Sequence, residues 1–237
     1  RPLRRLQLRY TVERTVREAA RIITGSEFSR DAIARSYGLD RDGIAVVPNA
    51  AAPVFRPVPR ETAVEAAASR FGVSGPFILT VGDLQPRKNH AGLIKAFAGL
   101  LRECPEVRQD LVIAGKDTWY SPAVRRAAED SGAGRRIRFL GFVSDEELLA
   151  LYNACDLFIF PSFYEGFGLP VLEAMACGAP VACSNVSACP EVADAAALLF
   201  DPNSPAAMAR VMAELVFDEE LRARMGRLGR TRAAHFS

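Results

Sequence analysis

Residues 157–184, LFIFPSFYEGFGLPVLEAMACGAPVACS, contain the pattern that decides the fold. The stretch opens and closes on short apolar runs of strand length, LFIFPS and PVACS. Between them, PVLEAMAC has Pro170 where a helix would begin and Gly178 just past where it would end, which is the usual placement of these residues. A strand, a helix and a second strand in succession predict two parallel strands joined by a crossover helix.

The same alternation continues along the chain on both sides of this stretch. Strand candidates occupy residues 21–26, 44–49, 77–82, 110–115, 137–141, 157–162, 180–184 and 197–201. Helical periodicity occurs at 90–103, 122–130, 145–154, 170–177, 189–193, 205–216 and 218–234. Ser144 and Glu147 have the spacing of a capping box at the start of the third of these helices. The sequence therefore predicts an α/β protein, with a parallel sheet covered by helices.

The composition excludes several classes of protein. With 237 residues, of which 49% are hydrophobic, the chain has enough apolar material for one or two cored domains. Its net charge of +2 and the lack of a basic stripe interleaved with aromatics argue against a nucleic-acid partner. The five cysteines form no C-x-x-C pair, so we expect reduced thiols in a cytoplasmic protein. No apolar run approaches the ~20 residues that a membrane-spanning helix needs.

The N-terminal segment 1–22, RPLRRLQLRYTVERTVREAARI, is rich in arginine and has neither the apolar core nor the cleavage site of a signal peptide. We interpret it first as a helix with a solvated basic face. A weaker alternative is peripheral attachment to anionic lipid, which would suit a lipid-linked substrate. The segment also lacks an initiating methionine, so we expect upstream sequence to precede it.

A domain boundary is predicted in the proline-rich segment 48–60, PNAAAPVFRPVPR, where the regular periodicity stops. The two strands and few helices before it have too little material for a core of their own. We therefore expect residues 1–53 to be the end of a partner domain and residues 54–237 to form a second domain.

Basic residues follow two of the strand candidates. In an open parallel sheet, ligands bind outside the carboxyl ends of the strands, where loops lead into helices. Arg87 and Lys88 follow strand 77–82, and Lys116 follows strand 110–115. An arginine fork and a lysine point charge together can bind a diphosphate. The alternative is a solvated turn. The residues PRKN alone do not favour either interpretation over the other.

The residues EGFGLP, 165–170, are the second candidate for a ligand site. Gly166 and Gly168 allow the backbone to approach a ligand closely, and the start of the following helix carries partial positive charge. Glu165 and Glu173 are then placed to accept hydrogen bonds from sugar hydroxyls. Alternatively, Glu165 only compensates the helix dipole and Glu173 lies on the helix surface. The apolar neighbours of Glu173 weaken that alternative, because a buried charge needs a partner.

The segments EGFGLP (165–170) and EAMACGAPV (173–181) resemble the E-x7-E signature of the retaining GT-B glycosyltransferases of family 4. Further matches are SEFSRDAIARSYGLDRDGIAVVPNA, PRKN, LVIAGK, IRFLGFVSDEELLALYNACDLFIFPS and SNVSACPEVADAAALLFDP. The likeness extends from about residue 20 to the end of the chain. A lone E-x7-E would be weak, but this ordered set of blocks is specific.

The resemblance implies a Rossmann-like domain that binds a nucleotide-diphosphate sugar and transfers the sugar across a cleft between two domains. Arg87 and Lys88 would hold the donor diphosphate and stabilise the leaving group. Glu173 would accept the ribose hydroxyls. Glu165 would lie against the transferred sugar and stabilise positive charge that develops at the anomeric carbon.

The resemblance also implies donor contacts that are made by backbone and apolar groups. The amides of Phe167, Gly168 and Leu169 would contact sugar and phosphate, and Val143 and Arg138 would border the base. No metal and no cofactor beyond the substrate itself are implied. This agrees with the sequence, which has neither an Asp-x-Asp cluster nor a set of His and Cys ligands.

This chain departs from the family pattern at several points. Gly82, which we include among the donor-binding residues, is followed by Asp83 where many relatives have arginine. One phosphate-binding arginine is therefore either missing or replaced by Arg87. Asp194-Ala195 stands where Gly-Asp is common. The family's acceptor site lies in an N-terminal domain, and both ends of this chain look truncated. Neither His90 nor His235 matches a family role; we expect His90 to cap a helix or face solvent.

The sequence thus predicts a retaining hexosyltransferase of mannose or glucose type, which uses a nucleotide-diphosphate sugar and a saccharide or lipid-linked acceptor. Two alternatives remain open. A GT-B nucleotide-sugar epimerase would form product without an acceptor. A non-catalytic nucleotide-sugar-binding module would bind donor without transfer. The sequence does not distinguish the base, the sugar or the acceptor.

Overall fold

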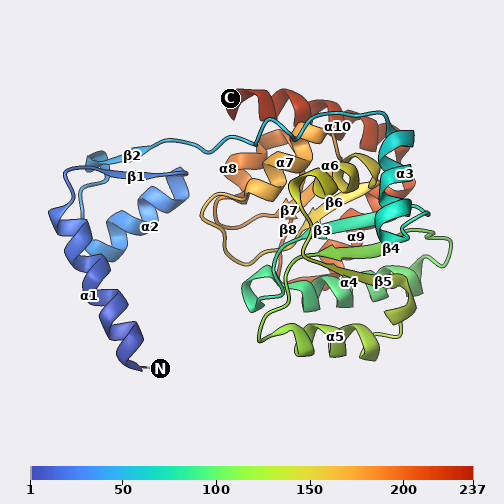
Figure 1. Ribbon diagram of the computed structural model, residues 1–237, viewed down its shortest axis with the longest axis horizontal. Helices are drawn as coiled ribbons and strands as arrows, with labels where there is room; N and C mark the ends of the chain where they lie inside the picture. The colour runs from blue at the N-terminus through green and yellow to red at the C-terminus, as the bar shows by residue number, and fades with distance from the viewer. Residues whose placement is uncertain (1, 237) are drawn as a thin grey trace. The chain divides into compact units, whose positions relative to one another are not determined.

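The computed structural model describes residues 2–236, and the chain divides into two compact units, Arg1–Asn49 and Ala50–Ser237. The first unit has a two-stranded parallel sheet with Ile22 opposite Ile44 (Figure 1). Its elements are α1 (Pro2–Glu18), β1 (Ile22–Thr24), α2 (Glu27–Tyr37), the 3-10 turn η1 (Arg41–Gly43) and β2 (Ile44–Val46). None of the residues of α2 is buried within the described chain. The role of this unit as part of an acceptor-side domain stays a prediction.

The second unit is built on a six-stranded, wholly parallel sheet (Figure 1). Its strands are β3 (Phe77–Val81), β4 (Asp110–Ala114), β5 (Ile137–Gly141), β6 (Leu157–Phe160), β7 (Val181–Ser184) and β8 (Leu198–Phe200). Their spatial order is β5-β4-β3-β6-β7-β8. The chain moves outward from β3 to β5, then returns to the other side of β3 to start β6. The strand order therefore reverses between β3 and β6, which is where open α/β sheets bind ligands.

Helices cover both faces of this sheet. They are α3 (Arg60–Phe71), α4 (His90–Glu103), α5 (Ser121–Asp130), α6 (Asp145–Ala154), α7 (Leu169–Cys177), α8 (Cys189–Ala193), α9 (Pro205–Phe217) and α10 (Glu219–Ala233). Short 3-10 turns are η2 (Pro86–Lys88), η3 (Gly134–Arg136), η4 (Asp194–Ala196) and η5 (Ala234–Phe236). Alternate residues of each central strand enter different cores, as Phe158 and Ile159 do in β6. One core packs against α3, α6, α7 and α8, and the other against α4, α5 and α9.

The local signals at the helix ends are confirmed. The Ser144 hydroxyl accepts a hydrogen bond from the Glu147 amide and the Glu147 carboxylate accepts one from the Ser144 amide, which completes the capping box of α6. Pro170 lies in the first turn of α7, and Gly178 ends that helix in the left-handed conformation. The β6–α7–β7 unit predicted from residues 157–184 is therefore present, with β6 and β7 paired in parallel.

The proline-rich segment after Asn49 opens the second unit and packs against its core. Phe55 is buried in the core next to α6, and Val54 and Val58 contact the same core. Asn153 fixes the segment further: its Oδ1 accepts from the Val58 amide at 2.9 Å and its Nδ2 donates to the Arg56 carbonyl at 3.0 Å. By contacts the two units meet between residues 49 and 50, and Ala51 also packs against the core of the second unit. The assignment of residues 1–53 and 54–237 to two functional domains stays a prediction.

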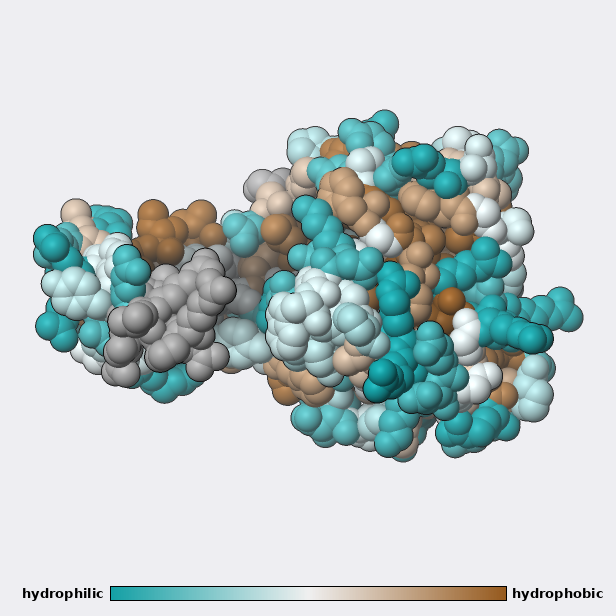
Figure 2. Space-filling view, turned by 60° about the horizontal axis from the view of Figure 1, so that its bottom comes forward, coloured by the Kyte–Doolittle hydropathy of each residue, from teal (hydrophilic) through white to brown (hydrophobic). Residues whose placement is uncertain are grey.

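The surface of the second unit is mixed in polarity. Figure 2 shows hydrophilic residues spread over one face, with patches of hydrophobic residues between them. Trp119 and Phe142 are the most exposed large apolar side chains of this unit, at 79% and 67%. Among residues 2–236, no helix combines the length and apolar character that crossing a membrane requires.

Candidate functional site

The loop from β3 to α4 supplies the basic residues of the site. Its short turn η2 ends at Asn89, which has φ = 56° and donates from Nδ2 to the Pro202 carbonyl at 2.8 Å. Gly82 opens the loop with φ = 156°, and a Cβ atom there would lie 3.0 Å from Cδ of Lys88. Glycine at this position therefore leaves room for the lysine side chain to lie across the end of β3.

The loop from β6 to α7 supplies the acid. Its backbone is tied to the first loop, since the Phe163 amide donates to the Arg87 carbonyl at 2.8 Å. On the other side, the Glu165 amide donates to Oγ of Ser187 at 3.0 Å, and Ser187 itself has φ = 57°. Because β3 and β6 are neighbours in the sheet, the two loops meet at the point where the strand order reverses.

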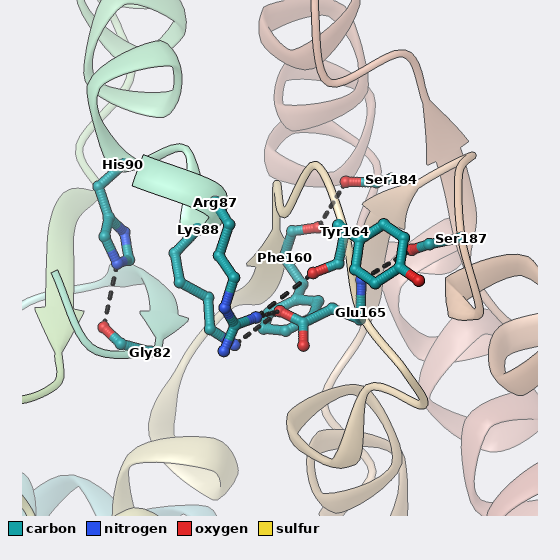
Figure 3. A network of polar contacts seen from close by, with 9 residues as sticks. All are labelled: Gly82, Arg87, Lys88, His90, Phe160, Tyr164, Glu165, Ser184 and Ser187. Atoms are coloured by element: carbon teal, nitrogen blue, oxygen red, sulfur yellow. Dashed lines mark hydrogen bonds and ion pairs between the residues drawn. The ribbon is translucent and has the colours of Figure 1, made fainter. Parts of the chain in front are cut away.

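Lys88, Arg87 and Glu165 form one cluster, shown in Figure 3. Oε1 of Glu165 accepts from Nζ of Lys88 at 2.7 Å and from Arg87 at 2.8 Å. The Lys88 and Glu165 side chains are 10% and 11% exposed, whereas Arg87 is 47% exposed. Nζ of Lys88 also lies 4.8 Å from the centre of the Phe160 ring, a cation–π contact. Two cations against one carboxylate give the cluster net positive charge, which favours an anionic ligand.

Glu173 lies on α7, about one turn after the helix begins. Its side chain contacts α6 and not the β3–α4 loop that contacts Glu165. Its Oε2 accepts from the hydroxyl of Tyr152 on α6 at 3.0 Å. Burial raises the pKa of Glu173 above its ordinary value, and the Tyr152 hydrogen bond opposes that rise. Glu173 is half-buried, so its carboxylate has both a protein partner and access to solvent. The sequence predicted that the Glu173 carboxylate needs a partner in its apolar surroundings, and that partner is Tyr152.

The predicted backbone contacts lie where β6 leads into α7. Gly168 is the residue before the helix and has φ = 103°, a conformation that glycine adopts without strain. Leu169 is 39% exposed at the first position of α7. Phe167 is buried, and its ring packs edge-on against Phe236 at 5.8 Å. The helix start therefore faces the loop that carries Glu165, while the Phe167 side chain serves the core.

The two residues predicted to border a base lie at opposite ends of β5. Val143 is buried just past the carboxyl end of the strand. Arg138 lies near its amino end, where its guanidinium contacts Asp110 at 3.2 Å and the Gly72 carbonyl at 3.0 Å. Asp110 begins β4, so these contacts lie at the edge of the sheet opposite the Glu165 cluster. The structure therefore groups Gly82, Arg87, Lys88 and Glu165 and separates Arg138 from them.

His90 is not at the surface, and the expectation that it caps a helix or faces solvent is wrong. The residue is 1% exposed, and its Nε2 lies 3.0 Å from the Gly82 carbonyl oxygen, as Figure 3 shows. Burial, with a smaller effect of nearby Lys88, lowers the pKa of His90 from 6.5 to about 4. The periodicity of α4 places this position on the buried side of the first turn. A neutral His90 thus supports the Gly82 end of the loop.

This buried histidine predicts a pH-dependent stability. Between pH 6.5 and 4 the unfolded chain binds a proton at His90 that the folded chain does not, so the free energy of unfolding falls as pH decreases. From pH 7 to pH 5 the loss should be roughly 2 kcal/mol. Urea denaturation at both pH values should show this loss in wild type, and His90→Gln, which keeps a donor for Gly82, should lack it.

The matched control is the second histidine, His235, which is exposed and has Nδ1 2.8 Å from the Thr231 carbonyl oxygen. His235→Gln should keep the wild-type dependence of stability on pH. Equal pH dependence in His90→Gln and wild type would contradict the assignment of the effect to His90.

Sequence reasoning missed two residues of the site. Ser187 holds the Glu165 backbone, and Tyr152 holds the Glu173 side chain. A signal for Tyr152 did exist, because a buried tyrosine hydroxyl needs a hydrogen-bond partner and Glu173 needed a donor. Ser187 had no such signal, since its role depends on its left-handed backbone. Within the described part of the chain, no group of three or more His, Cys, Asp or Glu side chains has the arrangement of a metal site.

Two curated proteins illustrate what this chain is similar to. O-antigen chain mannosyltransferase B of Escherichia coli is 37% identical over 217 residues, covering 91% of this chain and 56% of that protein. D-inositol 3-phosphate glycosyltransferase of Corynebacterium glutamicum is 37% identical over 198 residues, covering 80% of this chain and 47% of that protein. The chain therefore spans about half the length of the curated relatives it matches.

The structure of Anabaena HepE, solved in complex with UDP and glucose, superimposes with a TM-score of 0.84 at 24% identity, covering 96% of this chain and 62% of that one. This likeness confirms the predicted α/β fold with a Rossmann-like parallel sheet of the GT-B type. The model of the family called glycosyl transferases group 1 matches residues 63–232, which is most of the chain. The chain belongs to the glycosyl transferases group 1 family.

Proposed function

We propose that the protein is a retaining glycosyltransferase of family 4, which moves a hexose of mannose or glucose type from a nucleotide-diphosphate sugar to a saccharide or lipid-linked acceptor. The observation that carries this proposal is the cluster of Lys88 and Arg87 on one oxygen of Glu165 at the end of β3. Support for the sugar comes from relatives such as the mannosyltransferase of Escherichia coli. The resemblance to family 4 supports retention.

In the proposed reaction the bond between the anomeric carbon and the diphosphate oxygen breaks, and its electron pair stays on the diphosphate. Lys88 and Arg87 stabilise that charge, because their contacts with Glu165 hold both cations at the end of β3 before the donor binds. The acceptor oxygen forms the new bond, and its proton passes to the leaving phosphate. Glu165 lies between the cations and the sugar, where it stabilises positive charge at the anomeric carbon. No covalent intermediate is assigned.

The rest of the donor is assigned by position. Glu173 accepts the ribose hydroxyls, the amides at the start of α7 contact the sugar and phosphate, and Val143 borders the base. We leave Arg138 out of the proposed site, because Asp110 and Gly72 engage its guanidinium at the opposite edge of the sheet. The positive charge that a metal ion would bring to a diphosphate is supplied here by Lys88 and Arg87.

We place the reaction in the cytoplasm, with peripheral membrane contact if the acceptor is lipid-linked. All five cysteines are free thiols, as expected in a reducing compartment. Liposome cosedimentation at low and high salt tests the membrane contact. Binding to anionic vesicles that weakens with salt is expected, and equal behaviour with neutral vesicles would contradict it.

The test of the proposed function is a thermal-shift screen over UDP-, GDP- and ADP-sugars. A donor that binds the native state raises the melting temperature, by an amount equivalent to about 2.7 kcal/mol at a ligand concentration of 100 Kd. The donor that binds is then incubated with saccharide acceptors, and NMR of the anomeric proton of the product should show the configuration of the donor.

The outcomes of these assays separate the possible functions. Product formed from donor without any acceptor would point to an epimerase. Donor binding with neither transfer nor hydrolysis in the full-length protein would point to a binding module. If no nucleotide sugar shifts the melting temperature, the proposed donor site is wrong.

A further inference from the structure

Tyr152 is a fully buried polar side chain next to the proposed donor site. It projects from α6 and is 0% exposed. Its ring packs edge-on against Phe158 of β6 at 5.3 Å and against Phe55, from the segment before α3, at 5.7 Å. Aromatic rings on two sides fix the side chain in one orientation, so the position of its hydroxyl is set by the core.

The Tyr152 hydroxyl donates to Oε2 of Glu173 at 3.0 Å, a contact that joins α6 to α7. Burial and the nearby Glu173 carboxylate raise the pKa of Tyr152 well above its ordinary value, so the hydroxyl keeps its proton and donates. Tyr152 thus occupies one carboxylate oxygen of Glu173 and leaves the other for a ligand. A hydrogen bond to an ionised acceptor is among the stronger ones in proteins.

Besides the Tyr152 hydrogen bond, two effects shift the pKa of Glu173. Its own burial and Asp145, at the start of α6, both raise its pKa. Cys177, one turn further along α7, remains a neutral thiol because burial and Glu173 raise its pKa to about 12. The Tyr152 hydrogen bond acts in the opposite direction and lowers the pKa of Glu173. Among these neighbours, Tyr152 is therefore the one that favours the ionised carboxylate.

We propose that Tyr152 is a positioning residue for the donor, whose hydroxyl fixes the Glu173 carboxylate on α7 in the orientation that accepts a vicinal diol. The inference rests on the proposed function, since it takes the ribose hydroxyls of a nucleotide as the diol. Tyr152 itself does not touch the donor. Because Phe55 packs on the same ring, the segment that leads into the second unit takes part in fixing this carboxylate.

Tyr152→Phe tests the proposal, because it removes the hydroxyl and keeps the ring. With UDP-glucose and GDP-mannose as probes, the donor Kd should rise about ten- to hundredfold, the effect of losing a hydrogen bond to a charged group. The acid limb of the pH profile of donor binding should also move to higher pH, since Glu173 then protonates more readily. A purely structural role would lower the melting temperature and leave this limb unchanged. Tyr37→Phe, in α2, is the matched control and should match wild type.

Glu173→Gln separates a failure of this inference from a failure of the proposed function. If Glu173→Gln weakens donor binding but Tyr152→Phe changes neither the Kd nor the acid limb, the positioning role is wrong and the donor site stands. If Glu173→Gln binds both donors like wild type, the assignment of Glu173 to the donor fails. In the Glu173→Gln background, Tyr152→Phe should add less than about a twofold change, because the two residues act through one contact.

Discussion

Lys88→Ala is expected to lower kcat/KM for sugar transfer by about a thousandfold and to remove the donor-induced thermal shift. The Lys88 side chain is 10% exposed, and its Nζ lies 2.7 Å from Oε1 of Glu165. Water therefore screens its charge poorly. Arg87 does not replace it, because the Arg87 side chain is 47% exposed and its charge is better screened. Without Lys88 the proposed diphosphate site loses the more buried of its two cations, and the charge of Glu165 is less well compensated.

Lys95→Ala is the matched control for this variant. Lys95 lies on the exposed side of α4, seven residues after Lys88 in the sequence. It should bind donor and transfer sugar like wild type, which would separate the position of the lost charge from the change in net charge. Transfer within about threefold of wild type in Lys88→Ala would contradict the assignment of Lys88 to the leaving group.

The grouping of Arg87, Lys88 and Glu165 could be predicted, because it depends on where their loops lie along the chain and on the parallel direction of the strands. In a parallel sheet every strand ends at the same edge, so residues after β3 and after β6 are brought together once those strands are neighbours. The loops after these two strands contain Arg87, Lys88 and Glu165. Their positions at this edge of the sheet follow from the backbone alone, without knowledge of side-chain rotamers. The helix bounds could be predicted for the same kind of reason, since Pro170 and Gly178 act within one turn.

The remaining features depend on packing that a single sequence does not contain. The helix α3 had no predicted bounds, because its buried face consists of alanines such as Ala63 and Ala67 and its periodicity is weak. Arg138 is assigned to the base by the resemblance alone, although the predicted strand 137–141 already places it near the amino end of a strand, where the structure has it. The burial of His90 agrees with the periodicity of α4, whose buried residues include Leu93 and Phe97, but its contact with Gly82 depends on the fold of the loop and could not be predicted.

Glu165→Gln is expected to lower kcat by about a hundred- to a thousandfold while the donor Kd stays the same or decreases. In the free protein, Glu165 competes with the donor diphosphate for Lys88 and Arg87, because both cations contact its Oε1. Glutamine removes the negative charge and with it that competition, so the ground state of the complex is not weakened. In the proposed reaction, however, the positive charge that develops at the anomeric carbon loses the carboxylate that stabilises it.

Glu165→Asp is the matched variant, because it keeps the charge and shortens the side chain by one methylene. Its carboxylate cannot keep both the 2.7 Å contact to Lys88 and the 2.8 Å contact to Arg87, so kcat should fall less than in Glu165→Gln. Donor titrations give the Kd, and single-turnover transfer gives the chemical step. If Glu165→Gln instead raised the donor Kd with kcat unchanged, Glu165 would be a ground-state binding residue, and the stabilisation of charge at the transferred sugar would have to come from another group.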